Sequence, residues 1–439
     1  QFTVGNNQNH SGGSHIFYLF AHNDSGDGGF GPDGDADIIK CGSYTGGGSS
    51  SVAVDLGWEP QWLLLKNSSG SGNWHLLDNM RPWSVNSTAY AAPLYPNLSD
   101  QEYAPGVGGP KITSTGFVTY GGNGWSDIGD HIYIAIRRGT AVPESATEVF
   151  NVLKETSANL NQTPPYLQQT GFPVDLVSNK LFGGSSSWWT ATRLTNARLQ
   201  FESTGAETSV STSHEFDHND GVAVKGLTGD TNFMGYHWKR APKYMDVVAY
   251  TGNSTAGRTV SHNLGVAPEM MWVRPRSFAD HWNVYHTANG NTKYMRLNTT
   301  DTPFTNTNIW NSTTPDASSF TLGSDFGVNG SGYPYIAYLF ATLAGISKVG
   351  SFSHTNGTNS VVDCGFTSGA RFVLLKRTDS PDNWDLWDSA RGINTGTEPK
   401  LVLNTTSNES VTDEIDPDGS GFIYASGGNT GDYIFYAIA

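Results

Sequence analysis

An internal repeat constrains the fold of this chain more than any other feature of its sequence. Three segments each place an apolar run that ends in a basic residue ahead of a strand that begins with tryptophan. The basic residue and the last residue of that strand are 12 positions apart in each segment. The three pairs are Lys66 and Asp78, Arg274 and His286, and Lys376 and Asp388. Three agreements of this kind predict copies of one structural unit.

A fourth, weaker copy lies at residues 171–193, and each copy closes on an aromatic strand such as Tyr335–Ala341. Because the chain opens on a similar strand at His15–Ala21, we predict that residues 1–22 are the closing strands of a truncated repeat. Residues 23–37 are predicted to be an acidic, glycine-rich linker. The full repeats are predicted at residues 38–139, 140–242, 243–343 and 344–439 (repeats 1 to 4), with repeat 2 divergent. Each is long enough to form a domain with its own core.

The composition predicts the class of these domains. Of the 439 residues, 37% are hydrophobic and only 15% are charged, and 52 glycines separate short aromatic and β-branched runs. Such runs between turn residues are typical of strands. We therefore predict an all-β chain of tandem antiparallel β-sandwich domains of jelly-roll-like type, with Trp62–Lys66 as a central strand. Only Val149–Leu160 has a helical rhythm.

Charge and cysteine content exclude several classes of partner and fold. The net charge of −15 argues against nucleic acid and against anionic membranes, both of which favour Lys and Arg clusters. No apolar run approaches the roughly 18 residues of a spanning helix, so no membrane insertion is expected. Cys41 and Cys364 lie at non-equivalent positions of the repeat, so no disulfide framework is expected.

Two segments resemble metal sites, and we expect neither to bind metal. Residues 214–218 (HEFDH) fit the H-E-x-x-H pattern, in which a helix aims two histidines at one zinc ion. Their neighbours are strand and turn formers, so a polar connection between strands is expected instead. The acidic stretch Asp24–Asp37 offers oxygen ligands for calcium but lacks the spacing of a known calcium loop, which favours a solvated linker. No cofactor is expected.

Two groups of side chains are candidates for sugar binding. Lys66, Asp78 and Arg81 recur as Lys376, Asp388 and Arg391, which indicates either a binding or catalytic cluster or a structural ion pair. We favour the structural interpretation, because repeat 3 has His286 and Asn289 in place of the second and third residues. The candidate glycan-contact aromatics are the tryptophans in irregular, Gly- or Ser-rich surroundings, for which the alternative is burial in a core. They are Trp125, Trp188 and Trp189.

Strand phrases such as IIKCGSYTGGGSS from Ile38, and RFVLLKRTDS with NWDLWDSARG from Arg371 to Gly392, resemble a known repeated domain. That domain of unknown function recurs in tail and virion proteins of bacteriophages, notably marine phages. The resemblance covers nearly the whole chain. It implies a part of a virion and assigns no catalytic residue.

We therefore expect a non-enzymatic, extracellular structural protein of a virion, in a tail fibre or appendage, with contact to host-surface polysaccharide as a further expectation. Its expected partners are other virion proteins and further copies of itself, with a trimer as the default. One alternative is an array of carbohydrate-binding modules, which would have a shallow aromatic groove. The other is a polysaccharide-degrading tailspike, which needs a cleft with two carboxylates roughly 5–10 Å apart. If one repeat is specialised for binding, we expect it to be repeat 2.

Overall fold

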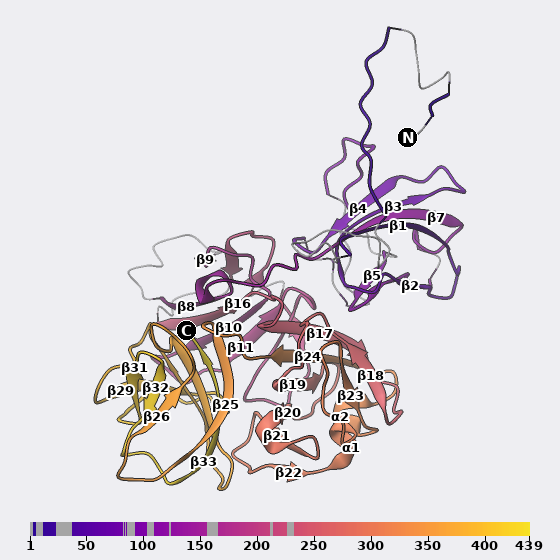
Figure 1. Cartoon of the computed structure of the whole chain (residues 1–439). Helices are drawn as coiled ribbons and strands as arrows, with labels where there is room; N and C mark the ends of the chain where they lie inside the picture. The colour runs from indigo at the N-terminus through magenta and orange to yellow at the C-terminus, as the bar shows by residue number, and fades with distance from the viewer. Residues whose placement is uncertain are drawn as a thin grey trace.

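The structure is a computed structural model that describes most of the chain (Figure 1). The described residues are 3–5, 12–22, 37–81, 83, 85, 93–102, 109–122, 124–155, 166–210, 214–225 and 232–439. Within them, the helices are four short segments: η1 (Ala146–Glu148), η2 (Thr287–Asn289), α1 (Thr307–Trp310) and α2 (Phe326–Asn329). All other regular structure is strand, and all strand pairs are antiparallel. The predicted all-β class with antiparallel sandwiches is confirmed.

Repeats 1 and 2 each consist of a large and a small sheet. In repeat 1 the large sheet has the order β1 (Ile39–Thr45), β7 (Asp130–Arg137), β3 (Pro60–Asn67), β4 (Trp74–Asp78), and the small sheet β2 (Ala53–Asp55), β6 (Gly116–Val118), β5 (Lys111–Thr113). In repeat 2 the large sheet has the order β13 (Thr208–Ser209), β12 (Ala197–Leu199), β11 (Trp189–Thr192), β10 (Leu176–Leu181), β16 (Phe233–Trp238), β8 (Phe150–Glu155). Its small sheet has the order β14 (His214–Glu215), β15 (Gly221–Val224), β9 (Tyr166–Gln169).

Repeats 3 and 4 follow the same plan. In repeat 3 the large sheet has the order β17 (Met245–Thr251), β24 (Pro334–Phe340), β19 (Met270–Pro275), β20 (Asn283–His286), β21 (Lys293–Arg296), β22 (Phe304–Thr305), and the small sheet pairs β18 (Arg258–Ser261) with β23 (Ser319–Leu322). In repeat 4 the large sheet has the order β25 (Ser347–His354), β33 (Gly431–Ile438), β27 (Phe372–Arg377), β28 (Trp384–Asp388), β29 (Glu398–Val402), β30 (Ser410–Thr412). Its small sheet has the order β26 (Ser360–Asp363), β32 (Gly421–Tyr424), β31 (Ile415–Asp418).

The closing strand of each repeat lies inside its large sheet, between the first strand and the central apolar strand. The register is the same in all four repeats. Lys66 faces Ile132, Lys180 faces Met234, Arg274 faces Ile336 and Lys376 faces Ile434. Each sheet is built from strands of one predicted repeat, and the run Trp62–Lys66 lies in a central strand as predicted.

The helical rhythm at Val149–Leu160 is a wrong prediction. The chain has the single 3-10 turn η1, capped by the Ser145 side chain, and then enters β8. Phe150 and Val152 are buried on one face of that strand, and β8 pairs with β16 along its whole length. Pairing with a strand distant in sequence therefore overrides the local pattern. Residues 156–160 lie outside the described residues.

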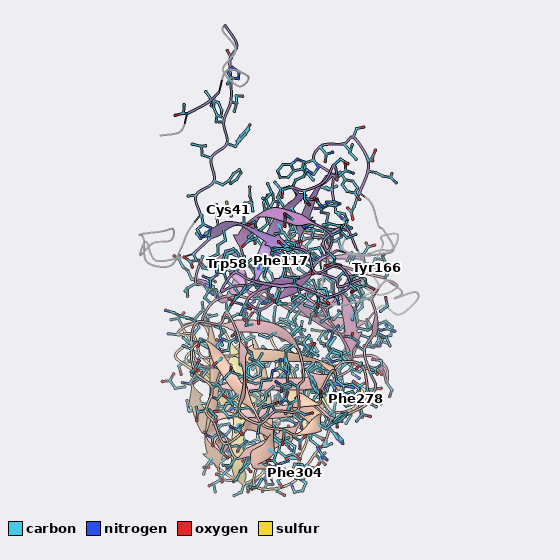
Figure 2. All side chains as sticks on the ribbon, turned by 90° about the vertical axis from the view of Figure 1, so that its right-hand side faces the viewer. Cys41, Trp58, Phe117, Tyr166, Phe278 and Phe304 are labelled. Atoms are coloured by element: carbon cyan, nitrogen blue, oxygen red, sulfur yellow. The ribbon has the colours of Figure 1, made fainter. Side chains whose placement is uncertain are left out.

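Residues 12–22 are extended and belong to none of the sheets (Figures 1 and 2). Ile16, Tyr18 and Leu19 are 80%, 82% and 74% exposed. The place of a closing strand is occupied in each of the four repeats by that repeat's own strand, which leaves this segment no sheet of this chain to join. Most of the predicted linker, residues 23–36, lies outside the described residues. Cys41 is half-buried, Cys364 is buried, and both are free thiols.

Repeats 2, 3 and 4 pack together, and repeat 1 stands at one end of this group (Figure 1). In each of repeats 2 to 4, one tryptophan donates its indole N–H to a backbone carbonyl of a neighbouring repeat. Trp282 of repeat 3 donates to Gln200 of repeat 2 (2.9 Å), and Trp384 of repeat 4 donates to Arg296 of repeat 3 (3.0 Å). Trp188 of repeat 2 donates to Val402 of repeat 4 (3.0 Å), which closes the cycle.

A second set of equivalent bonds repeats the same cycle in the backbone. The amide two residues before each tryptophan donates to the carbonyl four residues after each acceptor. These bonds join Asp280 to Thr204 (3.0 Å), Asp382 to Thr300 (2.9 Å) and Ser186 to Thr406 (2.9 Å). Three equivalent head-to-tail interfaces that close on themselves define a pseudo-threefold ring within one chain. We call repeats 2 to 4 the ring.

The ring explains why the central strands of repeats 3 and 4 are apolar on both faces. One face of each large sheet packs against its own small sheet, as Met271 and Val273 do in repeat 3. The other face, with Met270 and Trp272 in the same strand, packs toward the neighbouring repeats. Contacts across repeat boundaries include the rings of Phe340 with Tyr436, at 4.8 Å, and of Phe150 with Phe372, at 5.4 Å. The large sheets of the ring are therefore buried on both faces.

Candidate functional site

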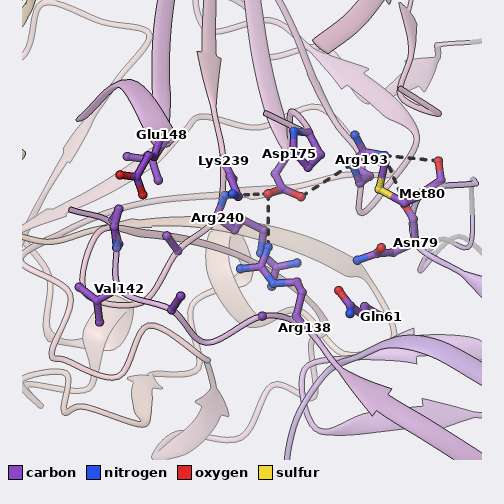
Figure 3. Close-up of a pocket in the computed structure, with 16 residues that line it drawn as sticks. Gln61, Asn79, Met80, Arg138, Val142, Glu148, Asp175, Arg193, Lys239 and Arg240 are labelled. Carbon is purple, nitrogen blue, oxygen red and sulfur yellow. Dashed lines mark hydrogen bonds and ion pairs between the residues drawn. The ribbon is translucent and has the colours of Figure 1, made fainter. Parts of the chain in front are cut away.

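The junction of repeat 1 with repeat 2 contains a cavity of about 330 Å³ (Figure 3). Its lining comes from the turn after β4, from the segment that follows β7 and from the end of β16. The charged side chains that line it are Arg138, Glu148, Asp175, Arg193, Lys239 and Arg240. This concentration of arginines makes the cavity the first candidate for binding an anionic ligand.

The arginines of this cavity are already paired with carboxylates. Arg240 binds both oxygens of Glu59 at 2.6 and 2.8 Å and Oδ1 of Asp246 at 2.7 Å. Asp175 accepts from Arg138 at 3.3 Å and from the Arg240 amide at 2.7 Å, and lies 3.8 Å from Arg193. Burial alone would raise the pKa of Asp246, but Arg240 and Arg138 bring it below its usual value. Three arginines and three carboxylates form a neutral cluster.

This cluster joins three repeats. Glu59 belongs to repeat 1, Arg240 to repeat 2 and Asp246 to repeat 3, and each is at most 5% exposed. Buried charges are stable only when they are paired and hydrogen-bonded, as here. The cluster therefore holds the three repeats in place, and its geometry favours a structural role over ligand binding.

Arg193 makes a second connection from repeat 2 to repeat 1. Its guanidinium donates to the carbonyls of Val174 (3.0 Å), Met80 (3.3 Å) and Phe216. Arg193 is 5% exposed, and its guanidinium carbon lies 5.6 Å from the centroid of the Phe216 aromatic ring. The Arg193 side chain thus connects three segments: the turn after β4, the residues just before β10 and the HEFDH segment.

The interior of repeat 2 contains a buried polar network beside a small apolar cluster that includes Phe172, Val177 and Val222. His214 Nε2 contacts Asn179 Oδ1 (3.0 Å), Asn179 Nδ2 donates to Gln168 Oε1 (3.2 Å), and His237 Nε2 contacts the same Gln168 oxygen (2.9 Å). All four residues are at most 4% exposed. Burial, with smaller contributions from Arg198 and His237, lowers the pKa of His214 to about 3. Burial also lowers the pKa of His237 to about 4.

This network is specific to repeat 2. Asn179 occupies the register position of Val273 in repeat 3 and Leu375 in repeat 4, and His237 occupies the position of Leu339. The motifs of repeat 2 do not indicate this network, although an alignment of the repeats strand by strand reveals both polar replacements. A second cavity of about 330 Å³ lies next to it, lined in part by Glu102, His214 and Asp217.

The HEFDH segment does not form a zinc site of the helical kind. His214 and Glu215 form the short strand β14, so His214 points into the core while Glu215 pairs with Lys225 at the surface. Because this segment is a short strand followed by a loop, the helical spacing that aims two histidines at one ion is absent. No three His, Cys, Asp or Glu side chains of the described residues gather in an arrangement that could hold a metal ion.

The three tryptophans proposed for sugar contact lie in different environments. Trp188 is fully buried between repeats 2 and 4, so its ring face is not accessible and the expectation is wrong for this residue. Trp189 is half-buried under the Arg198 guanidinium at 4.6 Å. Trp125 is half-buried and stacks on His75 with ring centroids 3.8 Å apart. The structure does not bring the three together into one groove.

The recurring Lys, Asp and Arg residues separate into two structural contacts. Asp388 and Arg391 form a fully buried ion pair at 2.6 Å, and Asp78 and Arg81 form the same pair in repeat 1. Lys376 lies at the other end of the strand and donates to the carbonyl of Thr300 in repeat 3 (2.9 Å). Burial lowers the pKa of Lys376 to about 8. These residues stabilise a turn and an interface between repeats, as the structural interpretation predicts.

Comparison with known proteins identifies the family. A model of DUF7483, a domain of unknown function, matches residues 1–138 and 241–439. The chain belongs to the DUF7483 family. The residues between the two matched segments coincide with repeat 2, whose core and HEFDH segment depart from the other DUF7483 repeats. No curated protein matches the chain. Among the described residues, no helix combines the length and the hydrophobicity needed to cross a bilayer.

Proposed function

We propose that this chain is a non-enzymatic structural protein of a bacteriophage virion, located on a tail fibre or another extracellular appendage. The observation that supports the proposal best is that the recurring tryptophans form contacts between repeats. Trp188, Trp282 and Trp384 occupy equivalent positions, and each bonds to the next repeat. A family of binding or catalytic modules would be expected to keep its recurring polar residues in open sites, whereas a rigid building element would use them for contacts between domains.

Rigidity is the physical property that such a part requires. The large sheets of the ring are buried on both faces, and the neutral cluster of Glu59, Arg240 and Asp246 ties repeat 1 to repeats 2 and 3. Interfaces between domains of one chain that are small and polar permit relative motion, whereas large apolar ones suppress it. A chain of this construction suits a role as a spacer or projecting element between other virion proteins.

Contact with host-surface polysaccharide is a second part of the proposal. The half-buried rings of Trp125 and Trp189 are the aromatic surfaces named above that remain accessible to a sugar. They lie in different repeats, which favours weak contacts at separate points over a dedicated array of carbohydrate-binding modules. A polysaccharide-degrading tailspike is less well supported, because the recurring carboxylate Asp388 is fully buried and paired with Arg391.

Immuno-electron microscopy of phage particles tests the proposal. Antibodies against the purified chain are expected to label a tail or fibre of the particles whose genome encodes it, and intact particles without label would contradict a virion location. The purified chain incubated with host-surface polysaccharide is expected to leave its chain length unchanged. Shortened polysaccharide in that assay would show a tailspike enzyme and would contradict the non-enzymatic role.

A further inference from the structure

We propose that repeat 1 binds the repeat 1 domains of two other copies of this chain through the outer face of its large sheet, which makes the protein a homotrimer. The inference does not depend on the proposed virion role. It rests on a comparison of repeat 1 with the three repeats that close the ring within one chain.

The outer face of the large sheet of repeat 1 is apolar and is not buried. Its apolar side chains are Trp62, Leu64, Leu76, Ile132, Ile134 and Ile136. All six are half-buried or exposed, and Ile132 is 44% exposed. The residues at the same six register positions of repeats 2, 3 and 4 are all buried. A contiguous apolar face of this kind on a domain surface marks an interaction site.

Repeat 1 also retains the residues that form the ring interfaces. Trp74 occupies the position of Trp188, Trp282 and Trp384, and it is half-buried where those three are at most 1% exposed. Among the described residues, no acceptor lies within hydrogen-bond distance of its indole N–H. Lys66 occupies the position of Lys376, which donates across a ring interface.

The acceptor side of a ring interface is present in repeat 1 as well. Asn97 accepts from the Trp74 amide at 2.9 Å, as Asn298 does from Trp282 and Asn404 from Trp384. This shared bond sets the register of the acceptor segment. Ser99 is thereby the counterpart of Thr300 and Thr406, whose carbonyls accept from the next repeat in the ring.

Three arguments identify the occupant as other copies of repeat 1. The ring is already closed by repeats 2 to 4, so none of them has an equivalent face left for repeat 1. The interface is head-to-tail, with a donor side and an acceptor side on each domain, and such interfaces close after three domains in this chain. The contacts of repeat 1 with the ring use loop residues, including Glu59, Met80 and Ser114, that flank the strands.

The test is the mass of the full 439-residue chain in solution, measured by light scattering and native mass spectrometry. We expect a particle of three chains of 47.3 kDa each. Ile132→Lys adds a charge to the face at a position that is 44% exposed and so tolerates solvent, so the domain should fold and the trimer should dissociate. We expect the concentration of half-assembly to rise by at least about tenfold, since an unpaired charge at a buried interface costs more than about 1.4 kcal/mol.

The matched control is Val361→Lys, which changes a β-branched strand residue that is 63% exposed on repeat 4. This variant should remain trimeric with wild-type stability. A second variant, Trp74→Ala, removes the indole donor and should weaken the trimer without adding charge. A wild-type chain that is monomeric or dimeric at micromolar concentration would overturn the proposal. A trimer that Ile132→Lys and Trp74→Ala leave intact would overturn the assignment to this face.

Discussion

Tyr236 in β16 donates a hydrogen bond of 2.8 Å to Oδ2 of Asp388 in β28, across the boundary between repeats 2 and 4. The two residues are 152 positions apart in sequence and neither is exposed to solvent. Asp388 also accepts from the Nε of Arg391 at 2.6 Å. The bond therefore couples the closing strand of the divergent repeat to a turn of the last repeat and helps to close the ring.

Replacing Tyr236 by Phe should destabilise the chain by about 1–2 kcal/mol, because the buried carboxylate of Asp388 loses one of its donors. Urea unfolding followed by fluorescence measures this free energy. Tyr338→Phe is the matched control at the same position of repeat 3, where the hydroxyl bonds to none of the described residues. Equal losses in the two variants would contradict a specific role for the Tyr236 bond.

Replacing any one of the three tryptophans that close the ring of repeats by Phe should lower the free energy of unfolding by a similar amount, about 2 kcal/mol. The substitution removes buried ring atoms and leaves a carbonyl of the next repeat without its donor. The variants are Trp188→Phe, Trp282→Phe and Trp384→Phe, and thermal unfolding compares them. Trp189→Phe, next to the first of these but half-buried, should change stability by less than about 0.5 kcal/mol. A large loss of stability in only one of the three variants would contradict the equivalence of the three interfaces.

Glu59→Gln should destabilise the junction of repeats 1, 2 and 3 by about 3 kcal/mol. The substitution removes the charge that Arg240 binds at 2.6 and 2.8 Å and leaves the guanidinium under-compensated in a buried site. The control is Glu215→Gln, which breaks the partly exposed pair with Lys225 and should cost less than about 1 kcal/mol. Differential scanning calorimetry distinguishes the two, and similar melting temperatures would show that the cluster is not essential to the junction.

Stability should fall as the pH is lowered from about 6.5 toward 4, and the polar core of repeat 2 should contribute to this loss. The pKa of His237 is about 4 in the folded chain, and that of His214 is about 3, against about 6.5 for a histidine in an unfolded chain. Between these values the unfolded state binds more protons, so acid favours unfolding, by up to about 1.4 kcal/mol per pH unit for each histidine.

His237→Gln keeps a neutral amide next to Gln168 and should reduce the slope of unfolding free energy against pH by about one proton in this window. The measurement is urea unfolding at several pH values from 7 to 4.5. His281→Gln, at a half-buried histidine outside the network, is the control for the effect of losing a histidine. If His237→Gln leaves the slope unchanged, His237 carries the same charge in the folded and the unfolded state, which would contradict its lowered pKa.

Much of the fold could be predicted from the sequence because it is repeated and local. The equal spacing of Lys66 and Asp78 with Lys376 and Asp388 reflects one strand pair, β3 with β4 and β27 with β28, in identical register. The polar core was also present in the sequence, since Asn179 stands where Val273 and Leu375 stand. The motifs shared by the repeats do not indicate it, because the polar replacements lie at single positions within two separate strands.

The positions of the candidate site residues could not be predicted in the same way. The surroundings of Trp188 are rich in Gly and Ser and suggest exposure, yet its indole donates to Val402, 214 positions away. The HEFDH segment matches the H-E-x-x-H pattern of a zinc site, yet its first two residues pair with β15 as a strand and the helix that such a site needs is absent.

The sequence by itself determined the repeat, the all-β class and most of the strands, because strand formation depends largely on residue type and spacing over a few neighbours. Only the tertiary structure decided that three repeats close into a ring and that the same sheet face is buried in these three and open in repeat 1. That difference depends on which domain meets which, and the tryptophan bonds that close the ring join residues at least 82 positions apart. Ile132 and Ile336 occupy the same register position, and only their neighbours in space make one exposed and the other buried.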